Sequence, residues 1–459
     1  MAKDENFPAA AGTRRHRIAV VGSGISGMSA AWLLNQTADV TLFEKAARIG
    51  GHTYTATVAA GDSSTAVDMG FIVYNEETYP NLTALFDHLG VTSQTTDMSL
   101  AVSLDNGRLE YGGGSLAQLF AQKRNLLRPR YWSMLRDLVR FYRTAAKDLP
   151  ALERSGATLG AYLAANRYGV AFQQDHLLPM AAAIWSMPTS DVLNYPAHAF
   201  IQFHNNHGLL KLAGRPLWRT VSGGSQAYVE RLMAPLGNRV RKGIGIQSIE
   251  RLPDSVVLRT SEGSCEVFDQ VVIATHADHA LALLANPTAE ERRVLSAFRY
   301  NDNCAILHSD ARLMPKRRRA WASWNYIGGR QHDTSDLTVT YWMNSLQALS
   351  LDTPLFVTLN PDRDIDPAKI FKTERFEHPI IDTAATNAQQ ELWTLQGQDR
   401  LWYCGAYFGA GFHEDGLQSG LAVAEALSGH RRPWRVADPS GRIVVKPHRV
   451  SPSLEGALV

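Results

Sequence analysis

RIAVVGSGISGMSAAWLL, residues 17–34, joins a short apolar run to a helical pattern through three glycines. The run at residues 18–21 is rich in β-branched side chains, which predicts a strand buried on both faces. Gly22 permits a tight turn, Gly24 lets the backbone approach a pyrophosphate, and Gly27 lets the following helix pack against the strand. Because that helix begins at the glycines, its free amide groups and the positive end of its dipole would face a diphosphate.

A glycine-rich turn between a strand and a helix can also be purely structural. The next apolar run, residues 40–43, ends at Glu44. This position follows Gly27 at close to the spacing of about 20 residues found in dinucleotide sites, where an acidic side chain binds the ribose 2′-hydroxyl. The alternative is a solvated glutamate at the end of a strand. Together the two runs predict a dinucleotide-binding βαβ unit.

Length and composition indicate more than one domain. The chain has 459 residues, of which 45% are hydrophobic, and its net charge of +2 gives no sign of a nucleic-acid partner. Its three cysteines, Cys265, Cys304 and Cys404, lack metal-site spacing and are odd in number. We therefore expect free thiols in a reducing compartment, with neither a disulfide framework nor a metal site.

Residues 13–34 superficially resemble a twin-arginine or secretory signal, because basic residues precede an apolar stretch. Glycines and serines interrupt that stretch, which already serves as strand, turn and helix. No apolar run reaches the roughly 18 residues that a membrane-spanning helix needs. The sequence therefore predicts a cytoplasmic protein whose residues 1–16 form a disordered leader.

Two stretches combine basic and aromatic residues. Residues 115–169 have a helical period in which arginines alternate with Leu, Trp, Phe and Tyr, and PKRRRAWASWNY (residues 315–326) repeats the combination. These stretches favour peripheral contact with the anionic inner face of a membrane. The alternatives are an ordinary helix whose arginines extend over a core face and a solvated loop.

Six separated blocks resemble the flavin-containing amine oxidase and phytoene desaturase superfamily, in that family's order, between about residues 17 and 428. They are VVGSGISGMSAAWLL (20–34), FEKAARIGGHT (43–53), VDMGF (67–71), VSGGSQAYVERL (221–232), FDQVVIATHAD (268–278) and YCGAYFGAGFHEDGLQSGLAVAEAL (403–427). In the last block, Gly405, Gly416 and Gly420 have an arrangement that recurs in the family where a second helix N-terminus meets the isoalloxazine ring.

This resemblance implies an α/β fold, in which a Rossmann-like FAD-binding domain of the glutathione-reductase type is interrupted by an α+β substrate domain. The FAD-binding domain would comprise residues 17–80, 215–290 and 395–430. The substrate domain would comprise residues 81–214 and 291–394, and residues 1–16 and 431–459 would be terminal extensions.

The resemblance also implies the contacts of bound FAD. Gly22, Gly24 and Gly27 would contact the pyrophosphate, and Glu44 the adenosine ribose. Arg48, Gly50 and Gly51 would follow the diphosphate toward the ring, while Val240 and Ile246 would pack on the adenine side. Gly405 would lead into the flavin loop, and the amides of Gly416, Leu417 and Gln418 would face the pyrimidine edge of the flavin and stabilise the charge formed on reduction.

Two features depart from the amine oxidases of this superfamily. Cys404 lies in the strand before the flavin loop, so we expect it in the core and the FAD to be non-covalent. The loop shows no clear match to the pair of tyrosines that flank the amine. GGHT, DMGFIVYN, AAAIWSMP and FHNNHGLL instead resemble a bacterial NAD/FAD-binding, amine oxidase-like branch. Genes of that branch often lie beside cyclopropane-fatty-acid-synthase-type genes, which implies a lipid acyl chain as the substrate.

The predicted function is FAD-dependent removal of two hydrogens from an apolar substrate by hydride transfer. The candidate catalytic residues are Tyr407, in an aromatic wall that would suit a hydrocarbon, and His413, which could accept a proton. Either side chain could instead pack beneath the loop. The polar group His204–His207 could hydrogen-bond a head group, and His52 could lie near the ring. The alternatives are an amine oxidase that releases hydrogen peroxide and a non-catalytic flavin-binding protein.

Overall fold

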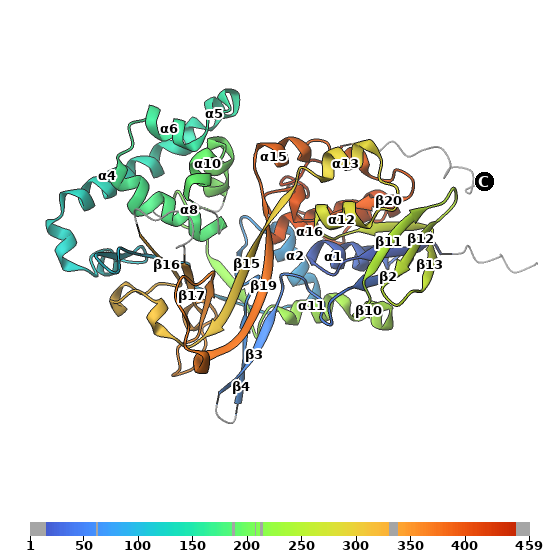
Figure 1. Cartoon of the computed structure of the whole chain (residues 1–459), viewed down its shortest axis with the longest axis horizontal. Helices are drawn as coiled ribbons and strands as arrows, with labels where there is room; N and C mark the ends of the chain where they lie inside the picture. The colour runs from blue at the N-terminus through green and yellow to red at the C-terminus, as the bar shows by residue number, and fades with distance from the viewer. Residues whose placement is uncertain are drawn as a thin grey trace, which may run out of the picture.

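A five-stranded parallel sheet forms the centre of one lobe (Figure 1). Its order is β10 (Val240–Lys242), β2 (Asp39–Glu44), β1 (Arg17–Val21), β14 (Gln270–Ile273) and β20 (Leu401–Tyr403). The computed structural model describes residues 15–60, 63–185, 189–206, 208–211, 214–329 and 338–446. Most of the predicted leader, residues 1–14, lies outside these ranges. The sheet brings together three segments that lie far apart in the sequence, as a discontinuous domain requires.

The predicted strand, turn and helix at residues 17–34 are confirmed. β1 pairs with β2 and β14, and α1 (Ile25–Leu34) is buried along its whole length. It lies between the sheet and α16 (His413–Ser428), which explains why its sequence is apolar on every face. α11 (Gln226–Met233) and α2 (Pro80–Leu89) complete this core.

A small antiparallel sheet lies beside the parallel one. It consists of β11 (Ile246–Arg251), β12 (Val256–Thr260) and β13 (Cys265–Phe268). The chain then returns through β14 to α12 (Ala277–Leu283) and α13 (Ala289–Leu295).

The second lobe is built on a seven-stranded mixed sheet. Its order is β19 (Ile370–Ile380), β15 (Arg299–His308), β18 (Phe356–Leu359), β17 (Thr338–Trp342), β16 (Trp324–Gly328), β7 (Leu100–Leu104) and β8 (Leu109–Gly112). The long strands β15 and β19 pair antiparallel and run between the two lobes (Figure 1). They carry side chains from the second lobe toward the first.

Helices make up the rest of the second lobe, as the helical period at residues 115–169 predicts. They are α3 (Leu116–Leu119), η1 (Lys123–Leu127), α4 (Pro129–Thr144), η2 (Ala145–Asp148), α5 (Leu149–Ser155), α6 (Leu159–Ala165), α7 (Val170–Phe172), η3 (Gln173–Leu177), α8 (Leu178–Trp185), α9 (Thr189–Asn194) and α10 (Ala197–Asn206). None of the helices in the described part of the chain is long and apolar enough to cross a bilayer.

Short elements connect the lobes. They are the hairpin β3 (Thr55–Ala60) and β4 (Ser63–Asp68), and a sheet of β5 (Tyr74–Asn75), β9 (Trp218–Val221) and β6 (Ser93–Thr95). α14 (Met343–Leu346), α15 (Thr383–Gln389) and the single turns η4 (Ala234–Arg239), η5 (Ala311–Leu313), η6 (Arg318–Ala320), η7 (Pro367–Lys369), η8 (Leu392–Leu395) and η9 (Ala406–Phe408) fill the loops.

Some elements pack with a different lobe from the one that the sequence boundaries give. α2, placed in the substrate domain, buries Leu82, Leu85 and Phe86 in the core of the first lobe. α13 and α15 do the same with Val294 and Ala385. Their apolar faces match this core, a pairing that sequence order does not reveal.

The segment after α16 also packs on the first lobe. Arg432 forms a bidentate ion pair with Glu425, and the Trp434 ring stacks on Trp32 of α1 with the centroids 5.8 Å apart. Arg442 pairs with the buried Asp415. The described part of the predicted C-terminal extension, to residue 446, is therefore integral to this lobe.

Candidate functional site

The glycine turn between β1 and α1 combines two structural glycines with an open one. Gly22 has a φ of +103°, and a Cβ there would lie 2.8 Å from the Ala274 carbonyl oxygen. A Cβ on Gly27 would lie 1.9 Å from the Gly22 carbonyl oxygen. A Cβ on Gly24 would have no atom within 4 Å. Gly24 therefore borders free space at the start of α1, where a diphosphate would approach the helix amides.

The loop at residues 48–51 lies directly on this turn. The Gly50 amide donates to the Ser23 carbonyl oxygen at 3.0 Å, and a Cβ on Gly51 would be 3.0 Å from Gly24 Cα. Arg48 donates from Nη1 to the Gly51 carbonyl oxygen at 2.7 Å. Its guanidinium lies 4.3 Å from the centre of the Tyr54 ring, which fixes the loop beside the turn.

Glu44 lies at the end of β2, where the sequence places the ribose ligand. Its Oε2 accepts hydrogen bonds from the Ser23 amide and hydroxyl at 3.0 and 2.6 Å, and its Oε1 accepts one from the Ala46 amide at 2.9 Å. The carboxylate is only partly buried, and each oxygen has a second lone pair for a hydroxyl group. The partly buried Val240 and Ile246 stand nearby, at the starts of β10 and β11.

The start of α16 corrects one prediction about the second helix. Gly416 donates its amide to the Phe412 carbonyl oxygen, and Leu417 and Gln418 lie farther inside the helix. Their amides are therefore used within the helix. The amides that a ligand can reach at this end are those of the first turn, on His413, Glu414 and Asp415.

The glycines of this region serve packing. A Cβ on Gly416 would lie 2.8 Å from Ile25 Cγ2, and one on Gly420 would lie 2.2 Å from the Ser26 carbonyl oxygen. They let α16 approach α1, so that the two helix starts meet. Gly405 exchanges hydrogen bonds with the Ser419 hydroxyl and so joins the end of β20 to α16.

His413 is the first residue of α16 and lies among aromatic side chains. Its ring stacks on Phe71 with the centroids 3.9 Å apart, and its Nε2 is 2.6 Å from the Tyr228 hydroxyl. That hydroxyl is 2.5 Å from Thr53 Oγ1. Burial lowers the pKa of His413 to about 3. The imidazole is therefore neutral near pH 7 and a weak proton acceptor, which argues against the predicted role in taking a proton.

Tyr407 lies away from the site. It is 2% exposed and packs against Phe298 and Phe408 in the core of the first lobe. Its predicted place in a substrate-facing wall is therefore wrong. Phe412 is the residue of that loop which meets the second lobe, because its ring stacks on Phe203 of α10 at 4.8 Å.

His204 is not available to a head group in the predicted way. Its side chain is fully buried, and Nδ1 bonds with the Phe200 carbonyl oxygen of the preceding turn at 2.8 Å. Asn205 is exposed, and His207 lies outside the described residues.

A group of histidines that the sequence analysis did not bring together lies next to His52. The His52 ring is 5.3 Å from His378 on β19 and 6.3 Å from His276 at the start of α12. His378 Nδ1 is 2.9 Å from Asn303 Nδ2 on β15. His52 Nε2 is buried and has no hydrogen-bond partner among the described residues. A buried polar atom of this kind calls for a bound group beside the loop at residues 48–51.

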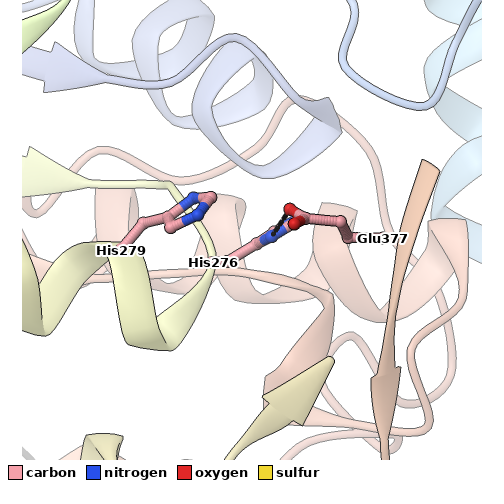
Figure 2. A group of neighbouring side chains, drawn as sticks. All are labelled: His276, His279 and Glu377. Carbon is pink, nitrogen blue, oxygen red and sulfur yellow. Dashed lines mark ion pairs between the residues drawn. The ribbon is translucent and has the colours of Figure 1, made fainter. Parts of the chain in front are cut away.

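His276, His279 and Glu377 form the outer part of this group (Figure 2). His276 Nδ1 and Glu377 Oε2 are 3.2 Å apart, but the three ligand atoms together spread over as much as 4.8 Å. A tetrahedral zinc site places its ligand atoms about 3.4 Å apart. The group is an ion pair with a stacked neighbouring imidazole, and the prediction of no metal site is left as it stood.

Asp68 is a second feature that sequence analysis missed. The side chain is fully buried, and its oxygens accept hydrogen bonds from Thr55, from the amide and hydroxyl of Ser225, and from Gln347. It therefore joins the blocks VDMGF and SGGS across the two lobes. The signal was present in the two quoted blocks, whose contact only the fold reveals.

The arrangement fits FAD in several respects. Two helix starts converge, Gly24 borders open space, Glu44 presents a carboxylate, and His52 has an unsatisfied buried nitrogen. Cys404 is fully buried in the core, and burial raises the pKa of its thiol well above the ordinary range. This placement, as predicted, removes it as a site of covalent flavin attachment.

Comparison with known proteins gives the same result. The family of flavin-containing amine oxidoreductases matches residues 25–311, more than half of the chain. Among solved structures, a protein described as a protoporphyrinogen oxidase from an Exiguobacterium species is 16% identical, with 92% of this chain and 100% of that chain covered and a TM-score of 0.64. Cyclohexylamine oxidase from Brevibacterium oxydans is also 16% identical, with 90% and 99% covered and a TM-score of 0.63.

A fatty acid isomerase from P. acnes that produces CLA is 16% identical, with 90% of this chain and 98% of that chain covered and a TM-score of 0.62. At these identities the likeness to solved structures establishes a shared fold. The family match adds the cofactor, non-covalent FAD, and the class of reaction. The chain belongs to the flavin-containing amine oxidoreductase family and is an FAD-dependent oxidoreductase.

Proposed function

We propose that the enzyme removes two hydrogens from a lipid acyl chain. The observation that carries this proposal is the apolar junction between the lobes, where Phe412 stacks on Phe203 and Phe71 covers His413. An acyl chain needs such a lining, because it offers no polar groups to hydrogen-bond. The fatty acid isomerase with the same fold supports a substrate of this class.

The charged groups at the start of α16 are turned away from this junction. Glu414 accepts hydrogen bonds from the amides of Asn81 and Leu82 and from two side-chain amides. Asp415 is paired with Arg442 and accepts from the Phe412 amide. Both carboxylates are therefore committed within the protein, which favours an uncharged substrate over an ammonium group.

The residues of the chain would divide the work as follows. Bound FAD supplies a two-electron acceptor that takes a hydride. The first-turn amides of α16 would stabilise negative charge at the pyrimidine edge, and the paired Tyr228 and His413 would fix the position of the first turn. Phe412 and Phe203 would hold the acyl chain and exclude water. Loss of a hydride and a proton from neighbouring carbons leaves a carbon–carbon double bond.

An amine oxidase is the second candidate. Cyclohexylamine oxidase and a putrescine oxidase bound to putrescine share the fold. This chain, however, places Tyr407 in the core, so that a tyrosine from the flavin loop does not oppose Phe412. The predicted departure from the amine-binding pair therefore favours the acyl-chain substrate.

The test is a turnover assay in which products are identified by mass. Purified holoenzyme and an artificial electron acceptor are given either phospholipid in mixed micelles or a panel of primary amines. We expect an acyl product with two fewer hydrogens and no aldehyde from the amines. The variant Phe412→Asp should lose the lipid reaction, and Phe371→Asp, at an exposed site on β19, should retain it. Amine oxidation with peroxide release and unchanged lipid would overturn the proposal.

A further inference from the structure

A cluster of exposed apolar side chains lies at the end of the second lobe. Leu116 on α3, Leu126 and Leu127 on η1, and Trp132 on α4 are 77%, 48%, 88% and 49% exposed. Large apolar side chains usually project this far only where they meet a partner. We call these four residues, with the neighbouring Lys123 and Arg124, the η1 surface.

The η1 surface has a defined structure. Trp132 Nε1 donates to the Leu126 carbonyl oxygen at 2.9 Å, which holds the indole ring beside η1. The same indole ring lies 5.7 Å from the ring of Phe120. The apolar side chains are thus fixed next to one another on a convex edge.

The charge around these side chains has one sign. Residues 111–136 contain Lys123, Arg124, Arg128, Arg130 and Arg136 and no aspartate or glutamate, although the whole chain has a net charge of only +2. Lys123 and Arg124 are both exposed. Arg124 donates to the backbone carbonyl oxygens of Gly107 and Arg108, which orient its guanidinium without neutralising it.

The second basic-aromatic stretch has a different environment. Arg317 pairs with the fully buried Glu110 at 2.6 Å, and Trp321 is buried against Phe356. The membrane contact expected for residues 315–326 is therefore not supported. This contrast shows that the exposure at η1 is not a general feature of basic segments in this chain.

We propose that the η1 surface docks on an anionic lipid bilayer, with the leucines and Trp132 entering the interface and Lys123 and Arg124 contacting lipid phosphates. Protruding apolar residues between cations suit a bilayer, which has negative charge and accepts any shape. A protein interface would be flatter and poorer in lysine. α4 lies at the edge of the molecule remote from the parallel sheet, so the surface is free to approach a plane (Figure 1). The inference goes beyond the proposed function and does not depend on what the substrate is.

The test is flotation of full-length holoenzyme with vesicles. Vesicles of phosphatidylcholine with phosphatidylglycerol are compared with vesicles of phosphatidylcholine alone, at low and high salt. We expect binding to the anionic vesicles that weakens as salt is raised. Leu126→Ser with Leu127→Ser, and separately Lys123→Glu with Arg124→Glu, should each lower the bound fraction by about tenfold or more.

Matched controls are Leu252→Ser and Arg259→Glu, which alter exposed residues of the first lobe and should bind as the parent does. Every variant should keep its FAD content and turnover of micellar substrate, which separates loss of docking from loss of folding or activity. Equal binding of the η1 variants and the parent, or no binding to anionic vesicles, would overturn the proposal. A parent that forms dimers through Leu126 and Leu127 without binding vesicles would assign the surface to a second copy instead.

Discussion

Gly24 and Gly27 lie three residues apart in one turn and are glycine for different reasons. Gly24 has a φ of −65° and open space at its Cβ position, so alanine fits the protein itself. We predict that Gly24→Ala leaves the thermal unfolding of the apoprotein unchanged but weakens FAD binding by about tenfold or more, because the methyl group enters the diphosphate space.

The measurement is an FAD titration alongside thermal unfolding of the apoprotein. Gly27→Ala is the contrasting variant, since its Cβ would lie 1.9 Å from the Gly22 carbonyl oxygen and should destabilise the apoprotein. Parent-like FAD affinity in Gly24→Ala would show that the diphosphate does not lie at this turn.

His413 is predicted to act in its neutral form. Because burial lowers its pKa to about 3, His413→Gln should reduce the turnover number without altering its pH dependence between about pH 5 and 8. A pH–rate profile of parent and variant tests this. Tyr228→Phe is the companion variant, as it removes only the hydroxyl bonded to His413. Loss of an ionisation from the profile of His413→Gln would restore His413 as the proton acceptor.

Single residues could be predicted from sequence where the backbone itself sets the requirement. The glycines of the first turn and Glu44 follow from strand, turn and helix geometry. His276, His378 and Asn303 could not be found in this way, because they come from α12, β19 and β15 and meet only in the folded chain. The amides at α16 were placed three residues too late because the sequence does not show where that helix begins.

Helix α16 depends on the segment that follows it. Arg442 pairs with the fully buried Asp415 and donates to the Thr78 carbonyl oxygen, and its own amide donates to Gln418. We predict that Arg442→Ala lowers the free energy of unfolding by about 3–5 kcal/mol, because Asp415 is left as an unpaired buried charge. Urea unfolding measures the change.

The double variant Arg442→Ala with Asp415→Asn should recover much of that loss, since the uncompensated charge is then absent. Truncation before residue 431 should release FAD, because α16 forms one end of the cofactor site. A truncated chain that keeps its flavin would contradict the role given to this segment.

Elements with a strong local pattern were the predictable ones. β1, α1 and β14 are confirmed because an apolar run and glycine punctuation determine them. α2 and α13 were assigned to the wrong lobe, since an amphipathic helix shows which of its faces is apolar but not which core that face meets.

The whole molecule is expected to lose stability in acid. Burial lowers the pKa of His176 to about 3 and of His204 to about 4, from an ordinary value near 6.5. Between about pH 6.5 and 4 the unfolded chain binds protons at these sites and the folded chain does not, so stability present above pH 6.5 falls as the pH drops. Each residue contributes up to about 1.4 kcal/mol per pH unit in this window.

Urea unfolding at several pH values tests this, with His204→Asn as the variant. The slope of stability against pH should become shallower by about one histidine's share. An unchanged slope would show that His204 binds its proton equally well in the folded state. The exposed His16 gives a control variant, His16→Asn, which should keep the parent slope.

The central claim concerns the molecule as a whole: two lobes bring an acyl chain to FAD. The most direct measurement is anaerobic titration of the holoenzyme with phospholipid, followed by the visible flavin absorption. The account predicts bleaching by one equivalent of lipid, with an acyl chain that has lost two hydrogens. Flavin that stays oxidised with lipid and bleaches with an amine would contradict it.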